Sequence, residues 1–207
     1  MIKRLLIYLL VAVLTAALAV HVRVDEMPDQ AMVLGTLEGD TYTNEYLGFG
    51  CKLEGWSSPD GVIIDIFNMM ISQTLKASLG DADALKQIGD PKVILLEQSR
   101  NKLQLVIILM MDVYQELNLS FDAAMTDHIK NYFADQDGIK AVSAEKTQIQ
   151  MGSEKWNGVR ISFNQDGTNC YEQWFVVYKA DKIFLITITS YVTDATDRVL
   201  GKFFPLE

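Results

Sequence analysis

The chain has 207 residues, of which 49% are hydrophobic and 22% are charged. This balance is typical of a globular domain with a sizeable core, and it excludes a mainly disordered chain. The net charge of -9 at pH 7 argues against general binding to nucleic acid or to an anionic lipid surface, because such binding needs an excess of Lys and Arg.

The first residues predict an export signal. The basic pair Lys3-Arg4 precedes a largely apolar run from Leu5 to Val20, and Ala17-Leu18-Ala19 has the small-x-small form of a signal-peptidase site. We therefore expect residues 1–19 to be a signal peptide cut after Ala19, which makes the protein exported, either secreted or tethered at the outer face of a bacterial cytoplasmic membrane. An uncleaved membrane anchor is the alternative, although a span usually needs ~20 apolar residues. No cysteine directly follows the run, so a lipoprotein anchor is not available.

A linker and an opening hairpin are expected next. Residues 20–40 contain a proline and two glycines with no sustained period, which is typical of a linker. A single domain is expected over residues 41–207. The segment Thr41 to Trp56 alternates apolar and polar residues and predicts two short strands joined by a turn at Leu47-Gly48.

The following stretch begins with a helix signal. Ser58 as N-cap, with Pro59 and Asp60 in the first turn, predicts a helix from Pro59 to about Leu79. Two aliphatic runs then follow, at residues 93–99 and 103–113. We interpret them as a hairpin whose second strand is central and covered on both faces, with a buried helix at Leu103 to Leu117 as the alternative.

Ser120 offers an N-cap for a further helix in a region that Gly138 ends. The last third carries strand signals and a strong turn at Asn164 to Gly167. A closing helix is expected from Thr193-Asp194 to Phe203. The expected late strands are Lys146 to Met151, Val159 to Phe163, Thr168 to Lys179 and Lys182 to Tyr191. This order predicts the α+β class, with an antiparallel sheet and helices packed on its faces.

No catalytic constellation is evident. His21 lies beside the signal, so His128 is the domain's one histidine, which removes multi-histidine zinc sites and weakens Ser-His and Cys-His catalysis. We read His128 as the edge of a helix face rather than a catalytic group. The sequence thus predicts no catalytic residue, no metal site and no cofactor.

The two cysteines leave two interpretations open. Cys51 and Cys170 both lie on predicted strands of an exported chain, where disulfides are permitted. A bridge between them would add ~3–5 kcal/mol by the chain-entropy model, provided that their strands are neighbours with matching faces. Two buried free thiols are the alternative, because cysteine often packs as a small hydrophobic residue.

Carboxylates supply the one route to enzyme chemistry. Asp65 with Asp60, or Glu172 with Glu154, would do acid-base work if the fold brought either pair together. Fragments of a calcium loop occur at Asp81-x-Asp83 and at Asp135-x-Asp137, but each lacks the remaining ligands and the distal Glu.

Aromatic residues are the candidate binding groups, because rigid amphipathic rings give contact area at little entropic cost. Trp156, beside Asn157-Gly158, is the one that we expect to be most exposed, whereas Trp56 is expected to be structural. Trp156, Tyr171 and Trp174 are the residues that we select as binding candidates. The full set that would line a groove for a peptide or glycan is Tyr42, Tyr46, Trp56, Trp156, Tyr171 and Trp174.

Four segments carry a resemblance to a known family: TYTNEYLGFGCKLEGW, MGSEKWNGVRISF, YEQWFVVYKADKIFLITITS and TDATDRVLGKFF. They resemble uncharacterised exported proteins of Firmicutes that share the PsbP/Mog1-like α+β fold, over Thr41 to the C-terminus. The resemblance implies an antiparallel sheet with helices on its faces, a cell-envelope location and no established enzymatic activity. Relatives on that fold are accessory or binding proteins, but fold alone does not transfer their partners.

Three functions from different classes follow as hypotheses. The first is a non-enzymatic accessory domain that binds an envelope protein or a surface ligand, with the membrane contacted only through the N-terminal segment. The second is a carboxylate-dependent hydrolase of cell-wall or other glycans. The third is a structural spacer of the envelope, which predicts no concave site and no ligand.

Overall fold

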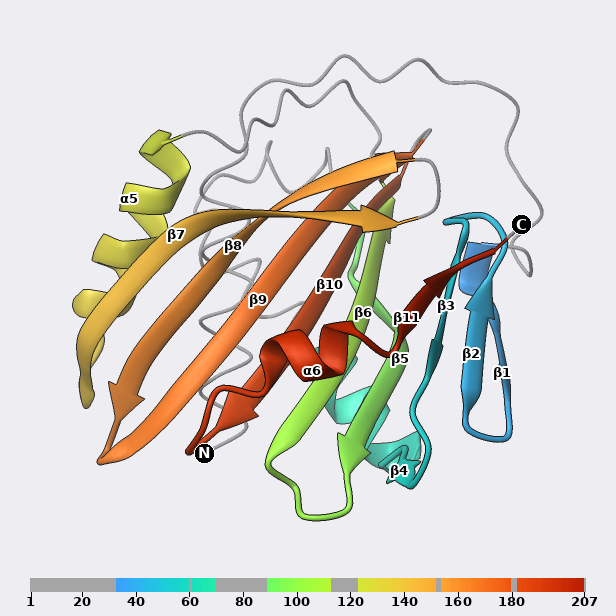
Figure 1. Ribbon diagram of the computed structural model, residues 1–207, viewed down its shortest axis with the longest axis horizontal. Helices are drawn as coiled ribbons and strands as arrows, with labels where there is room; N and C mark the ends of the chain where they lie inside the picture. The colour runs from blue at the N-terminus through green and yellow to red at the C-terminus, as the bar shows by residue number, and fades with distance from the viewer. Residues whose placement is uncertain are drawn as a thin grey trace.

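The computed structural model describes residues 33–59, 61–69, 89–112, 123–151, 154–179 and 182–206. The expected signal peptide, the first part of the expected linker and the C-terminal half of the helix expected to reach Leu79 lie outside these ranges. Most of the described residues are in strands, which form two antiparallel sheets (Figure 1). The fold is therefore mainly β, and the expected α+β class is wrong.

The larger sheet has seven strands in the order β4-β5-β6-β10-β9-β8-β7. Its last four strands form the expected meander, although β7 and β8 begin several residues earlier than their sequence signals. The strands are β4 (Trp56–Ser57), β5 (Lys92–Ser99), β6 (Gln104–Asp112), β7 (Ile139–Met151), β8 (Glu154–Gln165), β9 (Thr168–Lys179) and β10 (Lys182–Tyr191).

The expected hairpin at residues 93–113 is confirmed, and the helix alternative is wrong. β6 pairs with β5 on one side and with β10 on the other, and all its residues but Asp112 are buried. A strand that is paired on both sides and covered on both faces has no polar face. That is why its sequence is a continuous apolar run instead of an alternating one.

The smaller sheet joins the two ends of the described chain. It contains β1 (Thr36–Glu38), β2 (Thr41–Asn44), β3 (Phe49–Lys52) and β11 (Phe203–Pro205) in the order β1-β2-β3-β11. The expected turn at Leu47-Gly48 is confirmed, and the Gly48 N–H donates to the Asn44 carbonyl (2.9 Å). Residues 33–40 were assigned to the linker, yet they contribute β1 and the fully buried Val33.

The closing helix is shorter than expected. α6 spans Thr196–Leu200, and Phe203 lies in β11 opposite Cys51. The Gly201 N–H closes the last helical turn on the Asp197 carbonyl (2.9 Å). The chain then runs on as a strand because the edge of β3 offers backbone partners there, which the helical periodicity of the preceding residues does not reveal.

Each face of the larger sheet has its own core. On one face the smaller sheet and α6 pack against the strands, with Phe49 and Cys51 beside Ile108 and Phe184. On the other face lie α5 (Ala123–Ala134), which presents Ile129 and Phe133, and the helical residues 61–69, which present Phe67. A second sheet, with only the short helix α6 beside it, thus packs on one face of the larger sheet, and this is the reason for the corrected fold class.

A strained turn follows β10. Val192 has φ +72°, and the Thr193 N–H donates back to the Tyr191 carbonyl (2.9 Å) across it. This is a γ-turn of the rare positive-φ form. For a β-branched residue a positive φ is a genuine outlier that costs about 1–2 kcal/mol. Val192 is also 55% exposed, so it gains little from burial in return.

Val192→Asn is therefore expected to raise the free energy of unfolding by about 1 kcal/mol, because Asn tolerates positive φ. Urea denaturation followed by tryptophan fluorescence measures the change. Val192→Thr is the matched control, since it removes the exposed apolar surface but keeps the β-branch. Equal gains in the two variants would show that exposure, rather than backbone strain, destabilises this turn.

Candidate binding site

The aromatic residues selected from the sequence do not share a surface. Trp156 is only 2% exposed, so the expectation that it is the exposed one is wrong. Its ring packs edge-on against Phe49 of β3, with centroids 5.5 Å apart. The sequence did not show that the smaller sheet lies over this part of β8, and that is what buries Trp156.

The other two candidates are separated from Trp156. Trp174 is fully buried on the opposite face of the sheet, beside Phe133 of α5 (centroids 5.8 Å apart). Tyr171 is half-buried and lies opposite Ser162. Ser162 is six residues along β8 from Trp156, which is about 20 Å at 3.3 Å per residue. The three residues thus do not line one groove.

Both cysteines are free, and they belong to different cores. Cys51 lies in the core under the smaller sheet, and Cys170 lies in the core under α5. Burial raises the pKa of each thiol to about 12, with smaller contributions from Glu97 near Cys51 and from Glu172 near Cys170. Both side chains are therefore neutral thiols that are poor nucleophiles at neutral pH.

We expect a thiol reagent such as Ellman's reagent to modify neither cysteine in the folded protein at pH 7.5 within minutes. After unfolding in urea without reductant, both cysteines should react at once, because the exposed thiols regain an ordinary pKa near 8.5. Absorbance at the two endpoints checks this. If urea released no thiol until a reductant was added, a Cys51–Cys170 bridge would be present instead.

Of the two carboxylate pairs considered from the sequence, the structure describes both members of one, Glu172 with Glu154, and they lie far apart. Glu172 lies opposite Ile161, which is seven residues, or about 23 Å, along β8 from the backbone of Glu154. Asp60 lies outside the described residues, as does the fragment at Asp81-x-Asp83. Among the described residues, no group of three or more His, Cys, Asp or Glu is placed to hold a metal ion.

Glu172 is nevertheless unusual, because its carboxyl is fully buried under α5. The Trp174 indole N–H donates to Oε2 (2.7 Å), while Oε1 has no hydrogen-bond partner among the described residues. Burial raises the pKa of Glu172 to about 8, against the smaller opposing effect of the Trp174 hydrogen bond. The hydroxyls of Thr187 and Tyr191 on β10 are likewise buried, with no hydrogen-bond partner in the part of the chain that the structure describes. Glu172 is thus a protonated core residue at neutral pH. The side chain of His128, in α5, is not among those that the structure describes.

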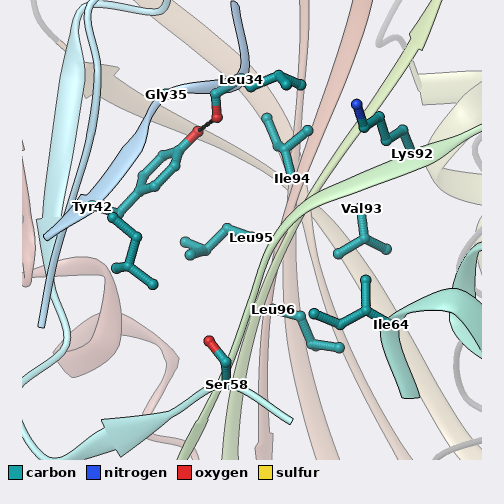
Figure 2. Close-up of a pocket in the computed structure, with 11 residues that line it drawn as sticks. Leu34, Gly35, Tyr42, Ser58, Ile64, Lys92, Val93, Ile94, Leu95 and Leu96 are labelled. Atoms are coloured by element: carbon teal, nitrogen blue, oxygen red, sulfur yellow. Dashed lines mark hydrogen bonds between the residues drawn. The ribbon is translucent and has the colours of Figure 1, made fainter. Parts of the chain in front are cut away.

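A cavity of about 360 Å³ lies at the edge of β5, between the two sheets (Figure 2). The smaller sheet and the residues before it provide one wall, β5 provides the opposite wall, and the helical residues 61–69 close one side through Ile64. It is lined by Leu34, Gly35, Leu37, Tyr42, Ser58, Ile64, Lys92, Val93, Ile94, Leu95 and Leu96.

The edge of β5 explains why a cavity forms here. β4 pairs with β5 only at Gln98 and Ser99, so among the described residues no strand lies beside Lys92–Glu97 on the side away from β6. A bulge between Val93 and Leu95 shifts the register, so that Ile94 and Leu95 both face the smaller sheet while Val93 faces the other core. Side chains from both faces thus converge at one edge.

Two contacts fix the walls. The Val93 N–H donates to Asn68 Oδ1 (2.7 Å), which ties the helical residues 61–69 to the edge of β5. On the opposite wall, a Cβ at Gly35 (φ +71°) would lie 2.5 Å from the Tyr42 hydroxyl. Glycine is therefore required at Gly35 for the Tyr42 ring to close this side of the cavity.

The hydroxyls at the cavity are already engaged. Tyr42 donates to the Leu34 carbonyl (2.9 Å), as Figure 2 shows, and accepts from Asn44 Nδ2 (2.9 Å). Ser58 donates to the buried carboxylate group of Glu97, whose pKa is raised by burial. The remaining walls are aliphatic, apart from the exposed Lys92. Such a site supplies apolar contact and one positive charge.

The aliphatic lining was missed from the sequence because apolar residues on a strand are typical of core. Tyr42 was named as a groove residue, although its role here is to form a wall. The feature of the sequence that could have indicated the bulge is Ile94-Leu95, because these two consecutive aliphatic residues face the same side of the sheet. Without the pairing register, however, such a run is indistinguishable from a strand covered on both faces.

No protein-family model and no curated protein matches the chain. A solved structure, described as LpqN involved in cell envelope biogenesis of Mycobacterium tuberculosis, is 10% identical with a TM-score of 0.35. That similarity covers 62% of this chain and 87% of LpqN. An identity of 10% and a TM-score of 0.35 assign neither a fold family nor a function. No family match supports the resemblance to PsbP/Mog1-like proteins of Firmicutes.

Proposed function

We propose that this chain is an exported, non-enzymatic binding domain of the cell envelope, and that the cavity at the edge of β5 is its binding site. The observation that carries the proposal is the cavity itself, about 360 Å³ in volume with mostly aliphatic walls. Ligand pockets typically have 300–1,000 Å³, apolar walls and a few polar groups. The basic and apolar N-terminal pattern supports the location at the envelope.

The chemistry of the walls favours binding over catalysis. The Tyr42 hydroxyl donates to a backbone carbonyl, and the Ser58 hydroxyl donates to the buried Glu97 carboxyl. The described residues that line the cavity include no histidine and no carboxylate, so the lining itself supplies no general base for a bound substrate. A carboxylate-dependent hydrolase needs two carboxyls in one site. Among the described residues the two deeply buried carboxyls, Glu97 and Glu172, lie on opposite faces of the larger sheet, since Glu97 neighbours Cys51 and Glu172 neighbours Cys170.

The test is site-specific photo-cross-linking in intact cells of the source organism, at native abundance. A photoreactive amino acid replaces Leu37, which lines the cavity and is 44% exposed. The matched control places it at Val192, which is 55% exposed and does not line the cavity. We expect one recurrent adduct from position 37 that is absent from position 192, on a mature chain that starts at Val20.

Mass spectrometry identifies the adduct and the N-terminus in the same sample. Equal labelling from both positions, or no adduct at position 37 from a well-exported protein, would refute binding at this cavity. A chain that still starts at Met1 would replace the cleaved signal by a membrane anchor.

A further inference from the structure

We infer that the cavity at the edge of β5 accepts one unbranched aliphatic chain that ends in a carboxylate, as in a medium-chain fatty acid, with the carboxylate at Lys92. This inference rests on the proposed function, because it names the ligand class of the same site. It follows from the polarity of the walls, the position of one charge and the size of the cavity.

The walls select an aliphatic ligand. Side chains of Leu, Ile and Val make up most of the lining, and both hydroxyls at the cavity are used within the protein. A ligand with polar groups along its length would lose hydrogen bonds to water and find no described side-chain partner inside. A hydrocarbon chain has no such cost and gains from every methylene that leaves water.

Lys92 favours a ligand that carries a negative charge. It lines the cavity from the start of β5 and is exposed, and it forms no ion pair with any described residue. In Figure 2 its nitrogen points to the side on which Leu34 and Ile94 lie. The chain carries 27 acidic residues, yet none of the described ones neutralises this ammonium group. An anion at the mouth of the cavity would complete the pair beside an apolar surface, where screening by water is reduced.

The volume selects the length. A cavity of about 360 Å³ has room for roughly a dozen groups of the size of a water molecule, which is close to the size of a methylene. Allowing for imperfect packing, a chain of about eight to ten carbons fills the site. Longer chains would extend into solvent and gain no further contact.

The test is calorimetric titration of the chain, in the form that the cells export, with saturated fatty acids of 6 to 14 carbons below their micelle concentrations. Affinity should rise about threefold to fourfold per methylene and level off near ten carbons. The corresponding n-alcohols should bind about tenfold more weakly, because they lack the charge that pairs with Lys92.

Two variants locate the effect. Lys92→Met keeps an unbranched stem and should abolish the difference between acid and alcohol, whereas the matched control Lys146→Met, on the distant β7, should preserve it. Ile94→Phe fills the cavity and should weaken decanoate binding at least tenfold. Thermal unfolding of each variant verifies that it is folded. A further titration, the vesicle arm, uses decanoate held in phosphatidylcholine vesicles. It distinguishes binding of the free acid from docking of the protein on a membrane.

Each outcome decides a distinct point. Equal binding of acids and alcohols would overturn the role of Lys92, and binding that Ile94→Phe leaves unchanged would overturn the location. If no aliphatic ligand binds but the photo-cross-linker at position 37 gives a specific adduct, the ligand class is wrong and the binding domain still stands. If no aliphatic ligand binds and position 37 gives no adduct, the proposed function is wrong as well. Binding only in the vesicle arm would overturn uptake of a free acid.

Discussion

Trp174→Ala is expected to lower the free energy of unfolding by about 5 kcal/mol. The Trp174 side chain is fully buried, packs against Phe133 and donates a hydrogen bond to the Glu172 carboxyl, which has no other partner among the described residues. Truncation of a buried tryptophan costs about 3–5 kcal/mol, and leaving a buried carboxyl without a partner adds about 1–3 kcal/mol. Domains of this size have a total stability of about 5–15 kcal/mol, so the variant will be close to unfolding.

Trp174→Phe separates the two contributions. Phe retains most of the apolar contact with Phe133 but removes the indole N–H, so its smaller loss, about 1–3 kcal/mol, reports the hydrogen bond to Glu172. Trp56→Ala is the matched control, because Trp56 is only partly buried at the edge of the larger sheet. Urea denaturation monitored by circular dichroism measures all three. Equal losses for Trp174→Ala and Trp56→Ala would contradict a central role for Trp174.

Glu172→Gln is expected to stabilise the protein at pH 8 by an amount on the order of 5 kcal/mol, and to have little effect at pH 4.5. Burial raises the pKa of Glu172 from 4.5 to about 8 in the folded protein. Between these values the unfolded chain has lost the proton and the folded chain still holds it. The folded state thus binds more protons, and stability falls as the pH rises through this interval. Glutamine has the same shape and does not ionise, so the decline should disappear.

The measurement is a series of urea denaturation curves from pH 4.5 to pH 9. Wild type should lose stability steadily up to about pH 8 and then level off, while Glu172→Gln should show a much flatter profile. Glu38→Gln is the control, since Glu38 is an exposed carboxyl on β1 and should leave the profile of the wild type unchanged. Parallel profiles for wild type and Glu172→Gln would show that the carboxyl is solvated in the folded state.

Local signals in the sequence were dependable for turns and for strand identity. The turn at Asn164 to Gly167 was predicted from its composition, and Asp166 (φ +49°) and Gly167 (φ +86°) adopt the positive φ that such turns need. The hairpin at residues 93–113 was predicted from aliphatic runs. Each of these depends on residues that are close in sequence, so the pattern contains the information that decides it.

Other features of the fold depend on contacts between segments that are far apart in the sequence. The alternation in residues 49–53 shows that one side of this strand is buried, but it does not say which sheet covers it. In the structure β3 pairs with β11, some 150 residues later, and the resulting sheet lies over β8. Because the smaller sheet lies there, Trp156 is buried and the expected aromatic surface does not form. The smaller sheet also occupies a face of the larger sheet on which helices were expected.

The sequence by itself thus determined most of the strands and the main turns of the described residues, while the export signal stays a prediction. Tertiary structure alone decided the pairing of the two chain ends into a second sheet and the separation of Cys51 from Cys170 on opposite faces. It also created the cavity, which needs the bulge at Ile94, the edge of β5 at Lys92–Glu97 that no other described strand covers, and the wall at Tyr42 together. These contacts join residues far apart along the chain, and their free energy depends on burial that no local pattern records.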